Sequence, residues 1–432
     1  METPIAKLDF HLVTPRAKNI TLLAAALAAG AALVAVPQNG WTLFAALAVL
    51  FATLTIRAPK SIRWCAGIAI LLIAVPIAGF KNSFLFELGT QMAMFAALAL
   101  GLNIVVGMAG LLDLGYAAFF AVGAYTWAIF GSPQATQFMH GNFPLPGWPY
   151  FYLFAGVAII AAAIVGTLVG LPALRLRGDY LAIITMGLGQ VVRLLANNLN
   201  SPVNITNGPQ GITQIERPPV TWITNIFHAL GITAADTTIY DLFFYLLVFA
   251  VIALIVQINI RLDRSRFGRA WVAIREDEIA ARAMGVPLLK TKLMAFATGA
   301  AFSGIMGAIF AARTRFISPD SFTFDRSITI LAMVVLGGMG SIRGAILGAG
   351  IVTLLNIEVL KSCSDWLNGL KQSHFILNLG FCHYDFASLP TQLDPTKFER
   401  LVFGLILILM MIFRPSGLIP ESRHRLELEK EE

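Results

Sequence analysis

The residues best suited to hold a polar solute lie in the stretch 103–123, NIVVGMAGLLDLGYAAFFAVG. Three glycines, at positions 107, 110 and 115, interrupt this otherwise apolar stretch, and the carboxylate of Asp113 lies among them. Glycines let helices pack closely, but glycines beside a carboxylate also predict a discontinuous helix whose free backbone groups line a cavity. An intramembrane carboxylate is functional by default, unless Asp113 lies at the inner membrane interface. The candidate substrate-pathway residues here are Asn103, Gly107, Gly110, Asp113 and Gly115.

A second polar motif, 206–211 (TNGPQG), lies on the side of the membrane that we expect to face outwards. Turn-forming residues alone explain such a run. A rigid turn at the mouth of a solute pathway explains it equally well, and the sequence does not decide between the two. The candidate pathway residues from this motif are Thr206, Asn207 and Gly208.

The most densely charged internal segment is 261–292, RLDRSRFGRAWVAIREDEIAARAMGVPLLKTK. Asp277 is placed to cap a short exposed helix of about two turns, with Glu278 in its first turn and Gly285 as its stop before a proline. A protein partner would bury the apolar side chains that recur here at helical spacing, which are Phe267, Trp271, Val272, Ile274, Ile279 and Met284. A solvated loop is the alternative, and the pattern alone leaves both open.

Catalysis and metal binding have little support in the sequence. No cluster of serine, histidine and acid and no nucleophile elbow appears, and no histidine falls in an expected span. Residues 285–291 resemble a phosphate loop but lack its second glycine, so we expect the chain itself to bind no nucleotide. Four potential ligands in one loop match no familiar zinc spacing and are better explained as polar loop residues: His374, Cys382, His383 and Asp385. We expect neither enzyme activity nor a metal site.

The elements that must position these residues are membrane-spanning helices. Of the 432 residues, 57% are hydrophobic and 13% charged, which is far more apolar than a soluble domain of this length needs. Stretches of about 20 apolar residues recur along the whole chain and predict about ten to twelve spans. The expected fold class is therefore all-α, a polytopic transmembrane helical bundle. The glycine-rich stretches 116–131 and 326–361 could instead be re-entrant or broken helices.

The formal net charge of +7 reflects the orientation of the chain rather than binding of nucleic acid. The basic residues lie in short connections between apolar stretches and never form a tract with interleaved aromatic residues. Their bias towards alternate connections predicts that both termini are cytoplasmic. The first apolar stretch, 20–36, follows a polar leader. A second span begins almost at once, with no convincing cleavage site before it, so we expect an uncleaved first helix.

Four regions follow from this topology. Residues 1–84 form an N-terminal extension with about three spans, 85–361 form a core that includes the charged segment 261–292, 362–397 form an external loop, and 398–432 form the last span and a cytoplasmic tail. Cys363 and Cys382 lie in the external loop, where an oxidising space would allow a disulfide. Sequence alone does not show that the two cysteines are close together.

Several motifs in order along the chain carry a family resemblance. They are 101–125 (GLNIVVGMAGLLDLGYAAFFAVGAY), 171–193 (LPALRLRGDYLAIITMGLGQVVR), 206–212 (TNGPQGI), 267–286, 316–340 and 413–418 (FRPSGL). These stretches resemble the permease subunits of bacterial branched-chain amino acid ABC importers, specifically the M-type subunit of the LivM family. The resemblance implies an inner-membrane importer in which this subunit and an H-type permease sit on two cytoplasmic ATPases and receive substrate from a periplasmic amino-acid-binding protein. It also implies that the ATPases, rather than this chain, bind ATP and Mg.

The resemblance assigns the charged segment to ATPase coupling, because in related importers a short cytoplasmic helix of the permease fits a groove on the ATPase. The general importer signature has Glu-Ala-Ala, three residues and then Gly. Ala280, Ala281 and Gly285 fit it, but Ile279 stands in place of the glutamate. The residues carried over are Arg266, Gly268, Arg269, Arg275, Glu276, Asp277, Glu278, Ala280, Ala281, Arg282 and Gly285. The insertion 362–397 and the extension 1–84 receive no role from the resemblance.

The function implied by the resemblance is ATP-driven import of leucine, isoleucine, valine or related amino acids by alternating access. The same machine carrying urea or short amides is the nearest alternative. An ion-coupled secondary carrier would need titratable groups deep in the spans, where Asp113 and Arg193 are among the few on offer. A membrane-embedded enzyme would need a catalytic constellation that this sequence does not offer.

Overall fold

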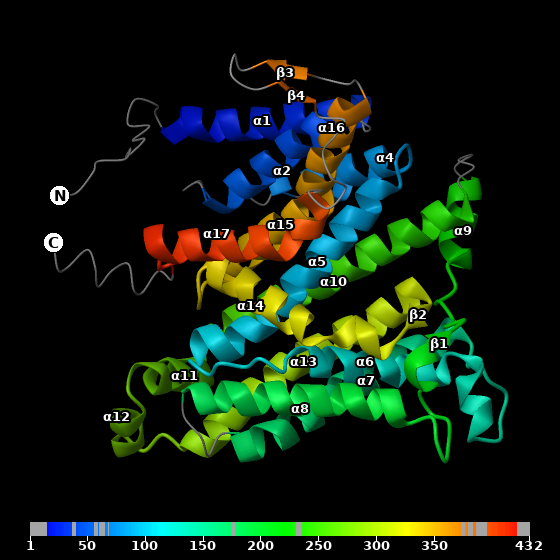
Figure 1. Cartoon of the computed structure of the whole chain (residues 1–432), viewed down its shortest axis with the longest axis vertical. Coiled ribbons are helices and arrows are strands. Elements are labelled where there is room, and N and C mark those ends of the chain that lie inside the picture. The colour runs from blue at the N-terminus through cyan, green and yellow to red at the C-terminus, as the bar shows by residue number, and fades with distance from the viewer. Residues whose placement is uncertain are drawn as a thin grey trace. The chain divides into compact units, whose positions relative to one another are not determined.

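The fold, seen in a computed structural model, is built mainly from helices (Figure 1) and divides into two compact units. One unit comprises residues 1–89 and 222–245, and the other comprises residues 90–221 and 246–432. The residues whose structure is described are 15–36, 40–55, 59, 65–67, 69–173, 178–229, 235–372, 376–378, 383–385 and 395–420.

The first unit is made of the early helices and a later helical excursion. Its elements are α1 (Pro15–Ala35), α2 (Gly40–Thr55), the π-helical segment η1 (Ala69–Ala74), α4 (Val75–Gly79), the start of α5 (Phe84–Leu102), most of α9 (Thr221–Ala229) and the start of α10 (Asp236–Asp263). A small apolar core contains Leu22, Ala26, Ala66 and Ile70. Tyr245 adds a polar contact, because its hydroxyl donates to the Leu71 carbonyl at 2.7 Å.

The second unit holds most of the helices and the site residues. Its elements are the rest of α5, the π-helical segment η2 (Asn103–Met108), α6 (Ala117–Phe130), η3 (Pro133–Gln137), α7 (Gly147–Ala173), α8 (Asp179–Asn198), η4 (Gly208–Gln210), β1 (Ile212–Thr213), the rest of α10, α11 (Arg266–Glu276), α12 (Glu278–Ala283), α13 (Leu288–Thr314), β2 (Phe316–Ile317), η5 (Pro319–Phe322), α14 (Phe324–Gly337), α15 (Ile342–Leu354), η6 (Leu355–Val359), α16 (Leu360–Gln372), β3 (Ile376–Asn378), β4 (His383–Asp385), η9 (Pro395–Phe398) and α17 (Glu399–Phe413). In the described part of the chain, strands form only two short antiparallel pairs, β1 with β2 and β3 with β4. The all-α class is therefore confirmed.

The core of the second unit lies where α13 packs along α6 and α7 (Figure 1). Gly123 of α6 faces Gly304 of α13 so closely that a Cβ on Gly123 would overlap the Gly304 backbone. Glycine thus permits the close approach of two helices. Large aromatic side chains on the same three helices, among them Trp127, Phe151 and Phe296, are fully buried and supply much of the apolar area.

Six helices in the described residues are long and apolar enough to cross a membrane. They are Phe84–Met108, Gly147–Pro172, Tyr180–Asn198, Asp236–Asp263, Leu288–Thr314 and Ile342–Gly369. Four shorter apolar helices accompany them: Thr21–Ala35, Cys65–Gly79, Ala117–Phe130 and Leu401–Phe413. The polytopic bundle follows from these lengths, while the predicted count of about ten to twelve spans stays a prediction.

The two glycine-rich stretches differ in continuity. Residues 117–130 form one unbroken helix, α6, whereas the stretch 326–361 breaks between α14 and α15. At this break Gly338 and Gly340 take φ angles of 117° and 81°, which favour glycine. The N–H groups of Leu418 and Ile419 donate to the carbonyls at the end of α14, each at 3.0 Å. The closing motif FRPSGL therefore packs on a broken helix.

The insertion 362–397 has structure of its own in the part that is described. Residues up to Gln372 continue helix α16, and β3 pairs with β4 in a short antiparallel ladder. Cys363 lies exposed on α16. Its predicted partner Cys382 and the loop residue His374 lie outside the described residues, so the disulfide stays a prediction.

Candidate pathway and coupling site

The predicted interruption in the stretch 103–123 is present. Helix α5 continues into the π-helical segment η2, which ends at Met108, and regular helix resumes only at Ala117. Between them Gly110 takes a φ of 68°, a left-handed conformation that a side chain disfavours. A π-helical turn is rare and is frequently found at functional sites.

Asn103 and Gly107 form a tight contact with a distant part of the chain. The Gly340 N–H, at the break between α14 and α15, donates to Asn103 Oδ1 at 2.8 Å. A Cβ on Gly107 would overlap both the Asn103 amide and the Gly340 nitrogen, so this position requires glycine. The interruption predicted in 103–123 and the break in 326–361, which the sequence left open, thus meet in space.

Asp113 lies fully buried in the loop between η2 and α6. Its Oδ1 accepts the Gly115 N–H at 2.9 Å, while Oδ2 has no hydrogen-bond partner among the described residues. The next residue in the chain, Leu114, donates its N–H to Thr185 Oγ1 of α8 at 3.1 Å. The loop is therefore fixed within the protein, and in this conformation the carboxylate is not accessible to solvent. Its predicted pathway role stays a prediction.

The motif TNGPQG, predicted to face outwards, forms a rigid turn beside the end of α8. Thr206 Oγ1 donates to the Ala196 carbonyl at 2.7 Å. Asn207 takes a left-handed φ of 60°, and its Nδ2 donates to the Gly211 carbonyl at 2.8 Å. The turn is held almost entirely by local bonds. It packs near the opposite end of α8 from Thr185, so the two sets of predicted pathway residues do not meet in one site.

The charged segment folds as two short helices rather than the single one predicted. Asp277 accepts the N–H groups of Ile279 and Ala280 at 2.7 and 3.0 Å and so caps α12. Gly285, with a φ of 82°, follows its end. Both of these predicted signals are confirmed. Helix α11 before it was missed, although Ser265 caps it in the same way by accepting the Phe267 and Gly268 N–H groups.

The apolar side chains of this helix pair divide between two directions. Trp271 is fully buried, and its Nε1 donates to the Thr291 carbonyl of α13 at 2.8 Å. Ile279 and Met284 point outwards instead, with 71% and 84% of their surface exposed. One side of the helix pair is therefore anchored to α13, and the other presents apolar groups that no described residue covers.

The carried-over coupling residues also divide between outward and inward positions. Gly268 and Ala281 are buried, Arg275 and Glu278 are half-buried, and the remaining residues are exposed: Arg266, Arg269, Glu276, Asp277, Ala280, Arg282 and Gly285. Glu278 reaches Lys292 of α13, with Nζ and Oε2 3.0 Å apart and only 7% of the lysine side chain exposed. Glu278 thus faces the permease body.

Arg275 joins the α11–α12 pair to the π-helical segment η2. Its Nη1 donates to the Gly107 carbonyl of η2 at 2.6 Å. A Cβ on Gly110 would contact the arginine side chain, so the glycines at 107 and 110 make room for this approach. A pocket of about 220 Å³ adjoins the contact and is lined in part by Gly107, Arg275 and Met339. Sequence reasoning placed Arg275 in the coupling set but found neither this contact nor the roles of Gly340 and Lys292.

The fold and site together define a polytopic membrane permease with a structured helix pair between two of its spans. The chain belongs to the family described as branched-chain amino acid transport system / permease component, which matches residues 84–411.

Individual relatives agree with this assignment. The chain is 37% identical to the high-affinity branched-chain amino acid transport system permease protein LivM of Escherichia coli (strain K12) over 376 residues, which cover 84% of this chain and 76% of that protein. It is 26% identical to a probable branched-chain amino acid transport permease protein LivM of Methanocaldococcus jannaschii over 74% of this chain and 84% of that protein. It is 25% identical to LivH of E. coli over 62% of this chain and 82% of that protein. Comparison with solved structures gave no match.

Proposed function

We propose that this chain is a permease subunit of an ATP-binding cassette importer that carries leucine, isoleucine and valine across the bacterial inner membrane. Family membership supports the transport role, and the names of the LivM relatives support the cargo. The main evidence for coupling to an ATPase is the α11–α12 pair. One side of this pair packs on α13, and the other side exposes the apolar residues Ile279 and Met284.

The partners in this proposal are an H-type permease, two cytoplasmic ATPases and a periplasmic amino-acid-binding protein. The similarity to LivH supports a related second permease. Both termini and the α11–α12 pair lie in the cytoplasm, in agreement with the distribution of basic residues. ATP and Mg belong to the ATPases, and this chain neither binds them nor catalyses hydrolysis.

Docking on the ATPase uses the exposed side of the helix pair, the side that points away from α13. Ile279 and Met284 enter an apolar groove of the ATPase, as amphipathic helices do in helix-in-groove complexes. Three exposed arginines lie on the same helix pair, Arg266 and Arg269 on α11 and Arg282 on α12, and they favour an acidic rim on the partner. The isoleucine in place of the signature glutamate thus contributes apolar area at the contact.

Transmission of the conformational change into the membrane uses the side of the helix pair that contacts η2. When the ATPases close, a shift of α11 acts through Arg275 on the Gly107 carbonyl, because a short charge-assisted hydrogen bond joins them. Gly107 belongs to η2, whose Asn103 accepts from Gly340 at the second helix break. The motion therefore reaches both breaks, and helix breaks are where transporters bind their solutes.

The cargo has the chemistry that broken helices accommodate. An amino acid zwitterion needs donors for its carboxylate and acceptors for its ammonium, and helix ends supply free N–H and C=O groups. An ion-coupled carrier is less well supported, since Arg193, one of the charged groups in the spans, is paired with Asp320 at 2.6 Å. Urea or a short amide would use similar backbone groups. A competition experiment on leucine uptake distinguishes these cargoes from the amino acids.

The test is uptake of radiolabelled leucine into proteoliposomes that contain the full complex with its binding protein. We expect uptake to require ATP, to survive collapse of the proton gradient, and to be competed by isoleucine and valine but not by urea. Uptake that continues without ATP and stops when the proton gradient collapses would contradict the assignment as an ATP-driven importer. Competition by urea alone would overturn the cargo and leave the importer standing.

A further inference from the structure

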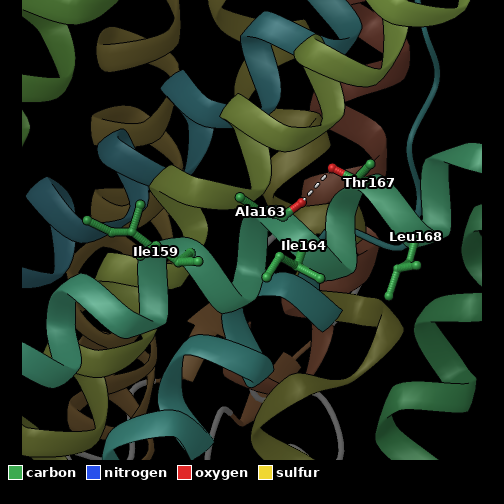
Figure 2. A pocket seen from close by; sticks show the side chains of 6 residues that line it. Ile159, Ala163, Ile164, Thr167 and Leu168 are labelled. Carbon is green, nitrogen blue, oxygen red and sulfur yellow. Dashed lines mark hydrogen bonds between the residues drawn. The ribbon is translucent and has the colours of Figure 1, made fainter.

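Two spanning helices of the second unit are equally exposed, and most of their exposed side chains are aliphatic, but only α8 also carries an amide, Gln190. In the apolar windows of both α7 and α8, 22% of the residues are buried. From Leu153 onwards, the large exposed side chains along α7 are aliphatic, for example Leu153, Ile160 and Leu168. A groove of about 380 Å³ runs along this face, and the hydroxyl of Thr167 within it donates to the Ala163 carbonyl of the same helix at 2.8 Å (Figure 2). Because its polar groups are satisfied within the helix, this face suits lipid acyl chains.

The start of α7 supports the same interpretation, and α8 likewise begins with an exposed aromatic residue, Tyr180. Trp148, Tyr150 and Tyr152 are exposed at the start of α7. Exposed tryptophan and tyrosine are enriched where a span enters the headgroup region. The lipid-facing side of α7 thus has both an aliphatic middle and an aromatic edge.

The exposed face of α8 is interrupted by a glycine and an amide. Ile183, Gly187, Gln190 and Leu194 follow one another at spacings that place them on one line along a helix. A Cβ on Gly187 would meet no atom within 4 Å, so no contact in the described chain requires glycine there. Gln190 is half-buried, and its amide has no hydrogen-bond partner among the described residues. A glycine inside a helix costs about 0.5–1 kcal/mol, and an unpaired amide in lipid costs more.

The combination distinguishes α8 from α7. Helix α7 also has a glycine beside open space, Gly156. No amide or charged side chain accompanies Gly156 anywhere on α7. Glycine lets spanning helices approach, and glutamine provides a hydrogen bond between them. A helix face that has both a glycine and a glutamine is therefore typical of a helix–helix contact rather than of a lipid-exposed surface.

The opposite side of α8 packs on the candidate pathway loop. A Cβ on Gly189 would contact the Gly115 Cα, and a Cβ on Gly115 would overlap the Thr185 carbonyl. Helix α8 is thus a single layer between that loop and the line at 183–194. Whatever covers this line lies close to the candidate pathway.

We infer that the line formed by Ile183, Gly187, Gln190 and Leu194 is the docking surface for the second permease subunit, an inference that rests on the proposed function. The occupant is a spanning helix of the H-type subunit. That subunit is expected to resemble this chain, because the chain is 25% identical to LivH. Two related subunits pair about a near two-fold axis, which sets corresponding helices against each other. Gln190 finds its hydrogen-bond partner across this contact.

Photo-crosslinking of the assembled complex tests the surface directly. Benzoyl-phenylalanine is placed at Ile183 or Leu194 of α8, which are 59% and 56% exposed, or at the matched α7 positions Ile160 and Ile164, which are 61% and 54% exposed. After irradiation in membranes we expect an adduct of this chain with the H-type subunit from the α8 positions, with a yield about tenfold above the α7 positions. Adducts with lipid alone from α8, or an equal or greater yield of the subunit adduct from α7, would overturn the inference.

A matched pair of glycine variants gives a second measurement. Gly187→Leu is expected to lower the amount of H-type subunit that co-purifies with this chain about tenfold. Gly156→Leu, whose glycine also has open space beside it, is expected to leave it unchanged. Equal effects of the two variants would count against the surface.

The readouts separate this inference from the proposed function. Both measure the association of two subunits and need no transport. If the H-type subunit and the ATPases co-purify with the unaltered chain but crosslinks arise from α7, the surface is wrong and the importer stands. If no second permease co-purifies with the unaltered chain, the proposed assembly itself is wrong.

Discussion

Two arginines, which the proposed orientation places at the inner and outer ends of the second unit, make contacts of the same length in different surroundings. Arg275 donates to the Gly107 carbonyl at 2.6 Å, and Arg193 lies 2.6 Å from the Asp320 carboxylate. Gly107 is buried, whereas the Asp320 side chain is 78% exposed. A buried carbonyl that loses its hydrogen-bond donor cannot bond to water instead, so the loss costs free energy. An exposed carboxylate stays hydrated when its partner is lost. Distance alone therefore does not rank the two contacts, and burial predicts that the inner one matters more.

The largest expected effect comes from filling the inner contact. Gly107→Ala places a methyl group where the Asn103 amide and the Gly340 nitrogen already lie. Overpacking of this kind costs about 1–3 kcal/mol, so we expect a lower melting temperature of the purified complex and loss of leucine uptake. Gly404→Ala is the control, because a Cβ there meets no atom within 4 Å. Equal melting temperatures for the two variants would show that the contact at Gly107 is looser than described.

The next effect comes from removing the inner arginine. Arg275→Ala leaves the Gly107 carbonyl buried without its charged donor, at a cost of about 1–3 kcal/mol. We expect ATPase activity of the complex to persist while leucine imported per ATP hydrolysed falls about tenfold. Arg275→Lys should rescue only in part, because lysine is a point donor on a flexible chain.

The neighbouring exposed Arg264 supplies the control for this prediction. Arg264→Ala removes an equal charge from the same segment without touching η2, and we expect transport per ATP to stay near that of the unaltered complex. An equal loss in both variants would mean that net charge, rather than the bond to Gly107, carries the coupling.

A smaller effect is expected on the outward side of the coupling helices. Met284→Ser removes apolar area from a side chain that is 84% exposed, so the fold of this chain should be unaffected. At the proposed ATPase contact the loss should weaken ATPase binding by about 1–2 kcal/mol, measured by titrating the detergent-solubilised permease with the ATPase. Met139→Ser is the control, as Met139 is also exposed but lies in the connection before α7. Unchanged ATPase affinity in Met284→Ser would remove Met284 from the contact.

The difference between local and distant contacts explains what the sequence could predict. Neighbouring residues in the sequence predict the cap at Asp277, the stop at Gly285 and the interruption after Asn103. All three features are present. Helix α11 has an equally local signal in Ser265, which the basic residues around it obscured. The Asn103 and Arg275 contacts join residues 237 and 168 positions apart. No local pattern specifies such a pair, because packing of whole helices brings them together.

The smallest effect is expected at the outer end. Asp320→Asn removes the ion pair with Arg193 but leaves a polar, exposed side chain that can still accept a hydrogen bond from the guanidinium. Exposed pairs contribute about 0–1 kcal/mol, and salt screens them. We therefore expect the melting temperature and leucine uptake of Asp320→Asn to stay close to those of the unaltered complex at high salt, with a small deficit only at low salt. A loss as large as that of Arg275→Ala, independent of salt, would show that the outer pair is shielded from water in the assembled transporter and that burial in the isolated chain underestimates it.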